Sequence, residues 1–270
     1  MLLASSNLLG MTPEELAAVG LRLDVDGAVA TITLDRPEVR NAQTPAMWLA
    51  LAAVGAALPD DVRVVVVTGE GDTFSAGLDR AMLDPANAGE GTVLGLLALT
   101  DEEASARIEK FQRGFTWLRD PRFVSIARVR GHAIGAGFQL ALACDLRVVA
   151  DDARFCMKES ALGLVPDLTG TKPLVELVGY ARALEICATA RVVTGEEAAR
   201  IGLATACVPG AGLDAAVADL AAALVAPMPG VVTETKTLLQ GATDRDLDEQ
   251  RRLEREAQVR RFRAMAAAFA

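Results

Sequence analysis

Short runs of consecutive apolar residues recur along this chain, and turns or helical periodicity follow them. Residues 62–68 and 123–129 are rich in β-branched side chains without alternation, which is typical of strands buried on both faces of a sheet. Residues 28–34 and 146–150 are further strand candidates. Since helical or loop sequence separates successive runs, the pattern predicts parallel strands joined by crossovers, and hence an α/β fold.

Helical periodicity dominates the rest of the chain. A helix is expected at 46–58 and an amphipathic one at 102–118, whereas residues 84–100 lack clean periodicity and predict a mobile flap or irregular loop. After Gly170 helix follows helix, with residues 205–209 as a candidate last strand. The helices expected there cover residues 173–178, 181–189, 194–201, 211–225, 231–239 and 247–269.

Composition and charge limit the classes of binding partner that we expect. The chain has 270 residues, 51% of them hydrophobic, and a net charge of −9 without a basic cluster interleaved with aromatic residues. This excludes nucleic acid and an anionic membrane surface as expected partners. No apolar stretch reaches the roughly 18 residues that a membrane span needs, and the first residues lack a basic leader, so we expect a cytoplasmic protein. Residues 1–10 are expected to be a loose extension or an over-extended start.

The cysteines do not indicate a metal site. Four are present, at positions without C-x-x-C spacing, and His132 is the only histidine in the sequence. We therefore expect reduced, mostly buried thiols and no bound metal. For His132 itself a structural role is the main interpretation and a catalytic one the alternative.

Two segments share the same order of strand, glycine turn and small residues that can open a helix. They are residues 71–79 (GDTFSAGLD) and residues 131–140 (GHAIGAGFQL). Turns of this kind leave backbone N–H groups without intrahelical partners. Two such groups aimed at one point would form an oxyanion hole, although glycine after a strand can simply permit a tight turn.

Two common glycine motifs do not fit these turns. A serine-hydrolase elbow needs glycine two positions before the serine, and Thr73 stands there before Ser75. A dinucleotide fingerprint at Gly135 and Gly137 would need a third glycine where Leu140 lies. Neither chemistry is predicted.

Read together, the two turns resemble the crotonase family, the enoyl-CoA hydratase/isomerase superfamily. Asn41-Ala42 upstream and the ACDLR sequence of residues 143–147 downstream complete the pattern, and the resemblance runs from about Val25 to about Phe262. It implies a spiral of ββα turns with a C-terminal helical region that trimerises. It also implies acyl-CoA thioesters as substrates, no metal or redox cofactor, and a homotrimer or a hexamer built as a dimer of trimers.

With this fold we expect three parts. Residues 1–20 would form an N-terminal extension and first helix, residues 21–205 the ββα core with the acyl-CoA site, and residues 206–270 the C-terminal helical region. The apolar residues Val259, Phe262 and Met265 in the last expected helix could lie across a neighbouring subunit. The alternative is a solvated face of a helix folded on its own core.

The resemblance implies backbone donors for a thioester enolate. Position by position, these donors are the N–H groups of Leu78 and Ala136. Because the donors are backbone groups, leucine and alanine side chains are no objection. The resemblance also places the CoA moiety against the backbone of Arg40, Asn41, Ala42 and Ala76. The Arg40 side chain would either bind a phosphate of CoA or be solvated.

Proton transfer needs ionisable side chains as well. Hydratases of the family use two glutamates, and the matching positions here are Gln139 and Glu159. Gln139 can orient a water or the thioester but cannot exchange a proton, so the two-carboxylate hydratase mechanism is in doubt. Glu159 is the expected acid/base group, with a surface acid next to Lys158 as the alternative.

A second carboxylate follows at Asp167, eight residues after Glu159. A turn or helix cap is one interpretation of Pro-Asp before a glycine. The other interpretation is a catalytic pair, because Glu159 and Asp167 are similar to the acidic pair of dienoyl-CoA isomerases. Those enzymes also have an aspartate at the position of Gln139. We therefore expect an enzyme of enoyl-CoA hydratase/isomerase type, a lyase or isomerase. The alternatives are a dienoyl-CoA isomerase-like enzyme using Glu159 and Asp167, or a non-catalytic acyl-CoA-binding protein.

Overall fold

A six-stranded sheet forms the centre of the molecule. The computed structural model describes residues 11–84, 86, 87, 89 and 91–269, and the sheet has the strand order β1-β2-β3-β4-β6-β9. The first two strands pair antiparallel, and each later neighbour pairs in parallel. The strands are β1 (Leu21–Asp26), β2 (Val29–Leu34), β3 (Val64–Gly69), β4 (Val124–Val129), β6 (Leu146–Ala150) and β9 (Ala206–Val208).

Both faces of this sheet are covered, which explains the continuous apolar runs. Val65 and Val67 of β3 pack into the larger core, whereas Val64 and Val66 point to the opposite face. There they pack against residues of α9 (Leu213–Val225). Strands buried on both faces leave no polar face, so alternation is lost.

A small second sheet lies beside the main one and was not predicted. It contains β5 (His132–Ile134), β7 (Arg154–Cys156) and β8 (Val193–Thr194), in that order. Since β5 comes directly before Gly135, the helix-opening turn leaves from the small sheet and not from β4.

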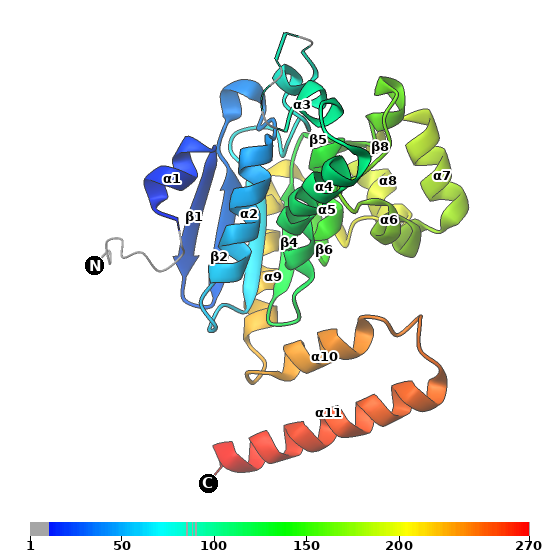
Figure 1. Ribbon diagram of the computed structural model, residues 1–270. Helices are drawn as coiled ribbons and strands as arrows, with labels where there is room; N and C mark the ends of the chain where they lie inside the picture. The colour runs from blue at the N-terminus through cyan, green and yellow to red at the C-terminus, as the bar shows by residue number, and fades with distance from the viewer. Residues whose placement is uncertain (1–10, 85, 88, 90, 270) are drawn as a thin grey trace.

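Helices surround the two sheets. Figure 1 shows α2, α4 and α5 in front of the main sheet, α9 behind it, and α6 to α8 at one side. The helices other than α9 are α1 (Pro13–Ala18), α2 (Pro45–Ala57), α3 (Val93–Leu97), α4 (Asp101–Thr116), α5 (Ala136–Ala143), α6 (Thr171–Val178), α7 (Tyr180–Thr189), α8 (Gly195–Arg200), α10 (Val231–Leu239) and α11 (Leu247–Ala268). Five 3₁₀ turns complete the described elements: η1 (Pro37–Val39), η2 (Arg80–Leu83), η3 (Trp117–Arg119), η4 (Glu159–Leu162) and η5 (Gly210–Gly212).

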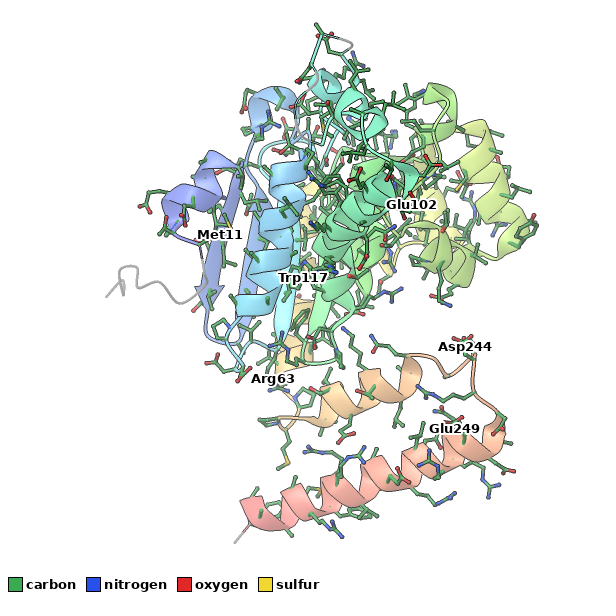
Figure 2. The ribbon with its side chains drawn as sticks, in the orientation of Figure 1. Met11, Arg63, Glu102, Trp117, Asp244 and Glu249 are labelled. Carbon is green, nitrogen blue, oxygen red and sulfur yellow. The ribbon has the colours of Figure 1, made fainter. Side chains whose placement is uncertain are left out.

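The last two helices form an arm that is attached to the body through polar contacts. Lys236 of α10 is buried, and its Nζ donates to the carbonyls of Asp120 and Phe123 and to Oδ2 of Asp145, each at 2.7 Å. Arg63, at the lower end of the sheet in Figure 2, donates to the carbonyl of Val225 at the end of α9. Burial of the Lys236 ammonium lowers its pKa, and the Asp145 carboxylate opposes this shift.

The outer helix of the arm exposes apolar side chains. Val259, Phe262 and Met265 are 46%, 59% and 43% exposed in the single chain. In Figure 1, α11 lies below α10 and away from the sheets. In the single chain this stripe does not pack on the sheets. Both a neighbouring subunit and a solvated face stay predictions for it, as does the homotrimer or hexamer.

The expected elements compare closely with the observed ones, with a few differences. The strand β1 was missed, although its apolar and charged residues alternate and Asp26-Gly27 is a hairpin signal. The segment 84–100 contains α3 instead of being irregular throughout. Residues 1–10 lie outside the described residues.

The division after residue 205 stays a prediction. The strand β9, which follows this boundary, pairs with β6 in the main sheet, and α9 packs on the same sheet. Across the described part of the chain, no helix combines the length and apolarity needed to cross a bilayer. The four cysteines are free thiols, and burial raises the pKa of Cys144 to about 12.

Candidate active site

The two glycine turns lie against each other in the folded chain. Ser75 N–H donates to the His132 carbonyl (2.8 Å) and Ile134 N–H donates to the Ser75 carbonyl (3.0 Å), so the first turn extends the edge of β5. Gly77 has φ +89°, and a Cβ atom there would collide with the Ile134 carbonyl oxygen. Only glycine permits this approach. His132 contributes its carbonyl while the residue stays exposed, in line with the structural interpretation.

The other side of the first turn is held by the segment before α2. Gln43 N–H donates to the Gly77 carbonyl (2.7 Å), and Asp79 N–H donates to the Gln43 carbonyl (2.8 Å). Because successive residues of an extended segment alternate in direction, the N–H of Leu78 points away from Gln43. Within the described residues, the Leu78 N–H donates to no protein acceptor.

The second turn opens α5. Gly135 has φ +50°, and its N–H donates to the Cys156 carbonyl (2.8 Å). The helix begins at Ala136, whose N–H lies in the first turn and has no intrahelical acceptor. A Cβ atom on Gly77 would lie 3.6 Å from the Ala136 nitrogen. The N–H groups of Leu78 and Ala136 therefore belong to adjoining pieces of backbone.

Glu159 begins η4, and its side chain lies beside the second turn. The residue is 8% exposed, and its Oε1 would lie 3.4 Å from a Cβ atom on Gly135. Oε1 accepts a hydrogen bond from Gln139 Nε2 (2.7 Å), whereas Oε2 is buried and has no partner among the described residues. Burial raises the pKa of the Glu159 carboxyl, and the charge of Asp167 raises it further. Such a carboxyl is a candidate acid/base group.

Asp167 lies in the loop between η4 and α6, within electrostatic range of Glu159. The residue is exposed, yet its carboxyl is partly desolvated, which raises its pKa. The N-cap of α6 is Gly170, and no side chain caps that helix, so Asp167 is not its cap. The Asp167 carbonyl accepts a hydrogen bond from Gln112 Nε2 of α4 (2.7 Å).

Gln139 is buried on α5, between Glu159 and the loop that carries Asp167. Its Oε1 accepts hydrogen bonds from the N–H groups of Leu168 (2.8 Å) and Gly170 (3.2 Å). Both ends of the amide are thus engaged within the protein.

The residues expected to contact CoA form one stretch of backbone beside the first turn. Arg40 and Asn41 have φ +54° and +55°, and the Arg40 carbonyl accepts a hydrogen bond from Ala76 N–H (2.8 Å). Arg40 is exposed, whereas Asn41 and Ala42 are buried. The structure therefore brings all four together.

Sequence reasoning missed the buried polar side chains that support the first turn. Ser75 Oγ donates to the Asn41 carbonyl (2.8 Å) and accepts from Gly77 N–H and Gln43 Nε2, both at 3.1 Å. The Asn41 side chain donates to the Thr73 carbonyl (2.6 Å). The available signal was a run of polar residues directly before an apolar helix, but their partners lie some thirty residues away.

Known proteins resemble this chain in sequence. The family model described as enoyl-CoA hydratase/isomerase matches residues 24–266. A short-chain-enoyl-CoA hydratase from Clostridium acetobutylicum is 30% identical over 238 residues, which is 87% of this chain and 86% of that protein. The peroxisomal Delta(3,5)-Delta(2,4)-dienoyl-CoA isomerase of Arabidopsis thaliana is 31% identical over 224 residues, which is 81% of this chain and 80% of that protein.

Solved structures agree with the sequence comparisons. A protein from Thermobifida fusca assigned as an enoyl-CoA hydratase, in complex with acetoacetyl-CoA, matches with a TM-score of 0.90 and 54% identity over 94% of this chain and 98% of that one. A structure of it with CoA gives the same TM-score at 52% identity over 95% and 98%. The predicted crotonase-like α/β fold and the predicted enzyme class, lyase or isomerase, are confirmed. This chain belongs to the enoyl-CoA hydratase/isomerase family.

Proposed function

We propose that this protein binds an acyl-CoA thioester and converts it through an enolate whose oxygen accepts hydrogen bonds from Leu78 N–H and Ala136 N–H. Negative charge appears on that oxygen only as a proton leaves carbon, so fixed donors stabilise the transition state more than the substrate. The adjoining, unpaired N–H groups support this role. The acetoacetyl-CoA bound to the Thermobifida fusca protein supports the class of substrate.

In this proposal Glu159 moves the proton. Its buried Oε2, which has no partner among the described residues, is the single observation that carries the proposal, because such an oxygen is open to a water or a ligand. Oε2 takes a proton from a carbon activated by the thioester, and the electrons of the broken C–H bond move to the thioester oxygen. Return of a proton to a different carbon shifts the double bond and leaves the composition of the substrate unchanged.

Double-bond isomerisation is favoured over hydration by the second acid/base group. The hydratase pattern needs a carboxyl at position 139, and the Gln139 amide cannot exchange protons. Asp167 is the remaining nearby carboxyl, and its pKa is raised, as is that of Glu159. Raised pKa values favour a pair with one ionised and one protonated member, which can take a proton at one carbon and supply one at another.

Hydration is the second candidate, and the name of the Clostridium acetobutylicum relative favours it. Asp167 would then act on the water that Gln139 cannot activate. A protein that only binds acyl-CoA is the third candidate. Gln139 favours it, and the raised pKa of the Glu159 carboxyl opposes it.

The CoA moiety would lie against the backbone of Arg40, Asn41, Ala42 and Ala76, with the exposed Arg40 side chain free to contact phosphate. Two expectations stay predictions: that the enzyme needs no cofactor besides its CoA thioester substrate, and that it is cytoplasmic.

The test uses crotonyl-CoA and a 3,5-dienoyl-CoA in D₂O, with products resolved by mass. Isomerisation leaves the composition unchanged apart from deuterium exchange, whereas hydration adds one water. Glu159→Gln should lower turnover by about 10²–10⁴ and leave acyl-CoA binding intact. Asp167→Asn should impair isomerisation, and Asp219→Asn, an exposed position on α9, should match the wild type. Unchanged turnover in Glu159→Gln would contradict the proposal, and tight binding without turnover would favour the binding protein.

A further inference from the structure

Gln139 touches both parts of the site that carry candidate acid/base groups. Its Nε2 donates to Glu159 Oε1 (2.7 Å), and its Oε1 accepts from Leu168 N–H (2.8 Å) and Gly170 N–H (3.2 Å). The residue is 1% exposed. One planar amide thus joins the Glu159 carboxyl to the loop directly after Asp167.

The loop has a conformation that needs such support. Thr169, between the two donors, has φ +71°, an unfavourable value for a β-branched residue. A Cβ atom on Gly170 would lie 2.8 Å from Gln139 Cγ, so the loop backbone packs directly on the glutamine side chain. On the far side, Gln112 Nε2 holds the Asp167 carbonyl. Two amides therefore fix the loop from opposite sides.

A neutral amide meets both demands at position 139 without gaining or losing a proton. The loop requires an acceptor, because Leu168 and Gly170 present N–H groups. The Glu159 carboxylate requires a donor. A glutamate would keep the acceptor but would set a second carboxylate against Glu159, and a methionine of similar length would supply neither.

We propose that Gln139 is a positioning residue that fixes the Glu159 carboxyl and the Asp167 loop relative to each other and takes no part in proton transfer. This inference rests on the proposed function of Glu159 and Asp167. It differs from the expectation that Gln139 orients a water or the thioester, since its amide oxygen and one N–H of Nε2 are already bound to protein groups. Oε2 of Glu159 is left as the oxygen that meets the substrate.

The first test measures the pKa of Glu159 directly, by ¹³C NMR of protein labelled at glutamate carboxyls, with Glu159→Gln assigning the signal. Gln139→Met removes a hydrogen bond to the ionised carboxylate, so the pKa should rise. Gln139→Glu adds a like charge, so it should rise further. Gln240, in the C-terminal arm, donates a hydrogen bond from its side-chain amide to the Arg119 carbonyl. The control variant Gln240→Met should leave the pKa of Glu159 unchanged.

The second test measures kinetics on the acyl-CoA that the wild type converts. Loss of a hydrogen bond to an ionised group predicts a fall in kcat of roughly 10- to 100-fold in Gln139→Met, with KM changed by less than about threefold. The acid limb of the pH profile should move to higher pH in both variants. If Gln139→Met fails to fold in a thermal melt, Gln139→Glu carries the test.

The outcomes separate this inference from the proposed function. A shifted pKa of Glu159 in a protein that converts no acyl-CoA would refute the proposed function but leave the contact role of Gln139 standing. An unshifted pKa in both variants would overturn the inference, whatever the activity. So would a Gln139→Glu variant with undiminished isomerisation, because the amide would then not be needed to position Glu159 and the Asp167 loop.

Discussion

The two glycine turns of this protein each present a backbone N–H group at the candidate site, but different contacts hold them in place. The first, residues 71–79, is held on one side by His132 and on the other by Gln43, through backbone hydrogen bonds. Ser75 Oγ links it to a third piece of backbone at Asn41. The second turn begins a helix at Ala136 and lies beside the Glu159 carboxyl. The first turn is thus rigid backbone, and the second adjoins the ionisable groups.

This difference decides what a substitution at each turn would disturb. A Cβ atom on Gly77 would meet a backbone carbonyl, which cannot move without shifting β5. A Cβ atom on Gly135 would meet only the end of the Glu159 side chain, at 3.4 Å. A change at Gly77 should therefore cost stability and geometry together, whereas a change at Gly135 should act mainly on the chemistry of Glu159.

The largest effect is expected from Gly77→Ala. Collision with the Ile134 carbonyl adds to the cost of φ +89°, and together they should lower the free energy of unfolding by about 3 kcal/mol or more. Displacement of the Leu78 N–H should lower turnover by about 10²–10³. Denaturant unfolding and acyl-CoA turnover measure the two effects.

Gly163→Ala is the matched control, because Gly163 has φ +74° and no atom within 4 Å of a Cβ position. It should cost only about 1 kcal/mol, the penalty for the left-handed conformation alone. Equal losses in the two variants would show that the contact between the turns contributes nothing.

The next effect is expected from Ser75→Ala in the first turn. The change leaves Gly77 N–H and Gln43 Nε2 buried without their acceptor. The free energy of unfolding should fall by about 2–3 kcal/mol, measured by denaturant titration. Ser160→Ala, at an exposed position, should change it by less than about 0.5 kcal/mol. If the two serines behave alike, the polar support of the first turn is unimportant.

Gly135→Ala tests the second turn and should act more gently on stability. Gly135 has φ +50° and ψ −117°, outside the left-handed helical region, and alanine there should cost about 1–3 kcal/mol of unfolding free energy. The new methyl group lies against Glu159, so kcat should fall about tenfold while acyl-CoA binding is kept. Calorimetric titration with acyl-CoA measures binding, and a turnover assay measures kcat, so the two effects can be separated. A variant that loses binding but retains kcat would reverse the assignment of the turns.

The smallest effect is a pH dependence of stability from Glu159. Its native pKa is raised, so the folded protein holds this proton more tightly than the unfolded chain. Stability must then fall as pH rises from the ordinary value of 4.5 to the native pKa, and stay level above it. The difference in unfolding free energy between wild type and Glu159→Gln, measured across this range, should fall with pH. A difference that rises with pH would mean that the carboxylate is stabilised in the fold.

The sequence predicted most of the central sheet because its strands are apolar on both faces. The runs at β3, β4 and β6 match the observed strands within two residues at each end. The missed strands are short or lie at an edge, as β1 and β5 do. A short strand such as β5 carries few apolar positions, and its partner β7 lies farther along the chain. The edge strand β1 instead pairs with the adjacent β2 through a tight hairpin.

The candidate site likewise has features that the sequence predicts and features that only the structure shows. Glu159 and Asp167 could be named from their positions in a family pattern, but only the folded chain shows that one is buried and the other is on an exposed loop. A cap for Asp167 was a sound local interpretation that the observed N-cap at Gly170 does not support. The contacts of Gln139 were the least predictable, because its hydrogen-bond partners lie 20 to 31 residues away.

The sequence by itself determined the α/β class, the two glycine turns and the residue types at the candidate site. These follow from local causes: β-branched runs, glycine where φ is positive, and carboxyl groups that can titrate. Tertiary structure decided which groups remain unpaired. Within the described part of the chain, the N–H of Leu78 and Oε2 of Glu159 have no protein partner, and contacts distant in sequence hold the residues that carry them. Burial and pairing are properties of the assembled core, and no local pattern encodes them.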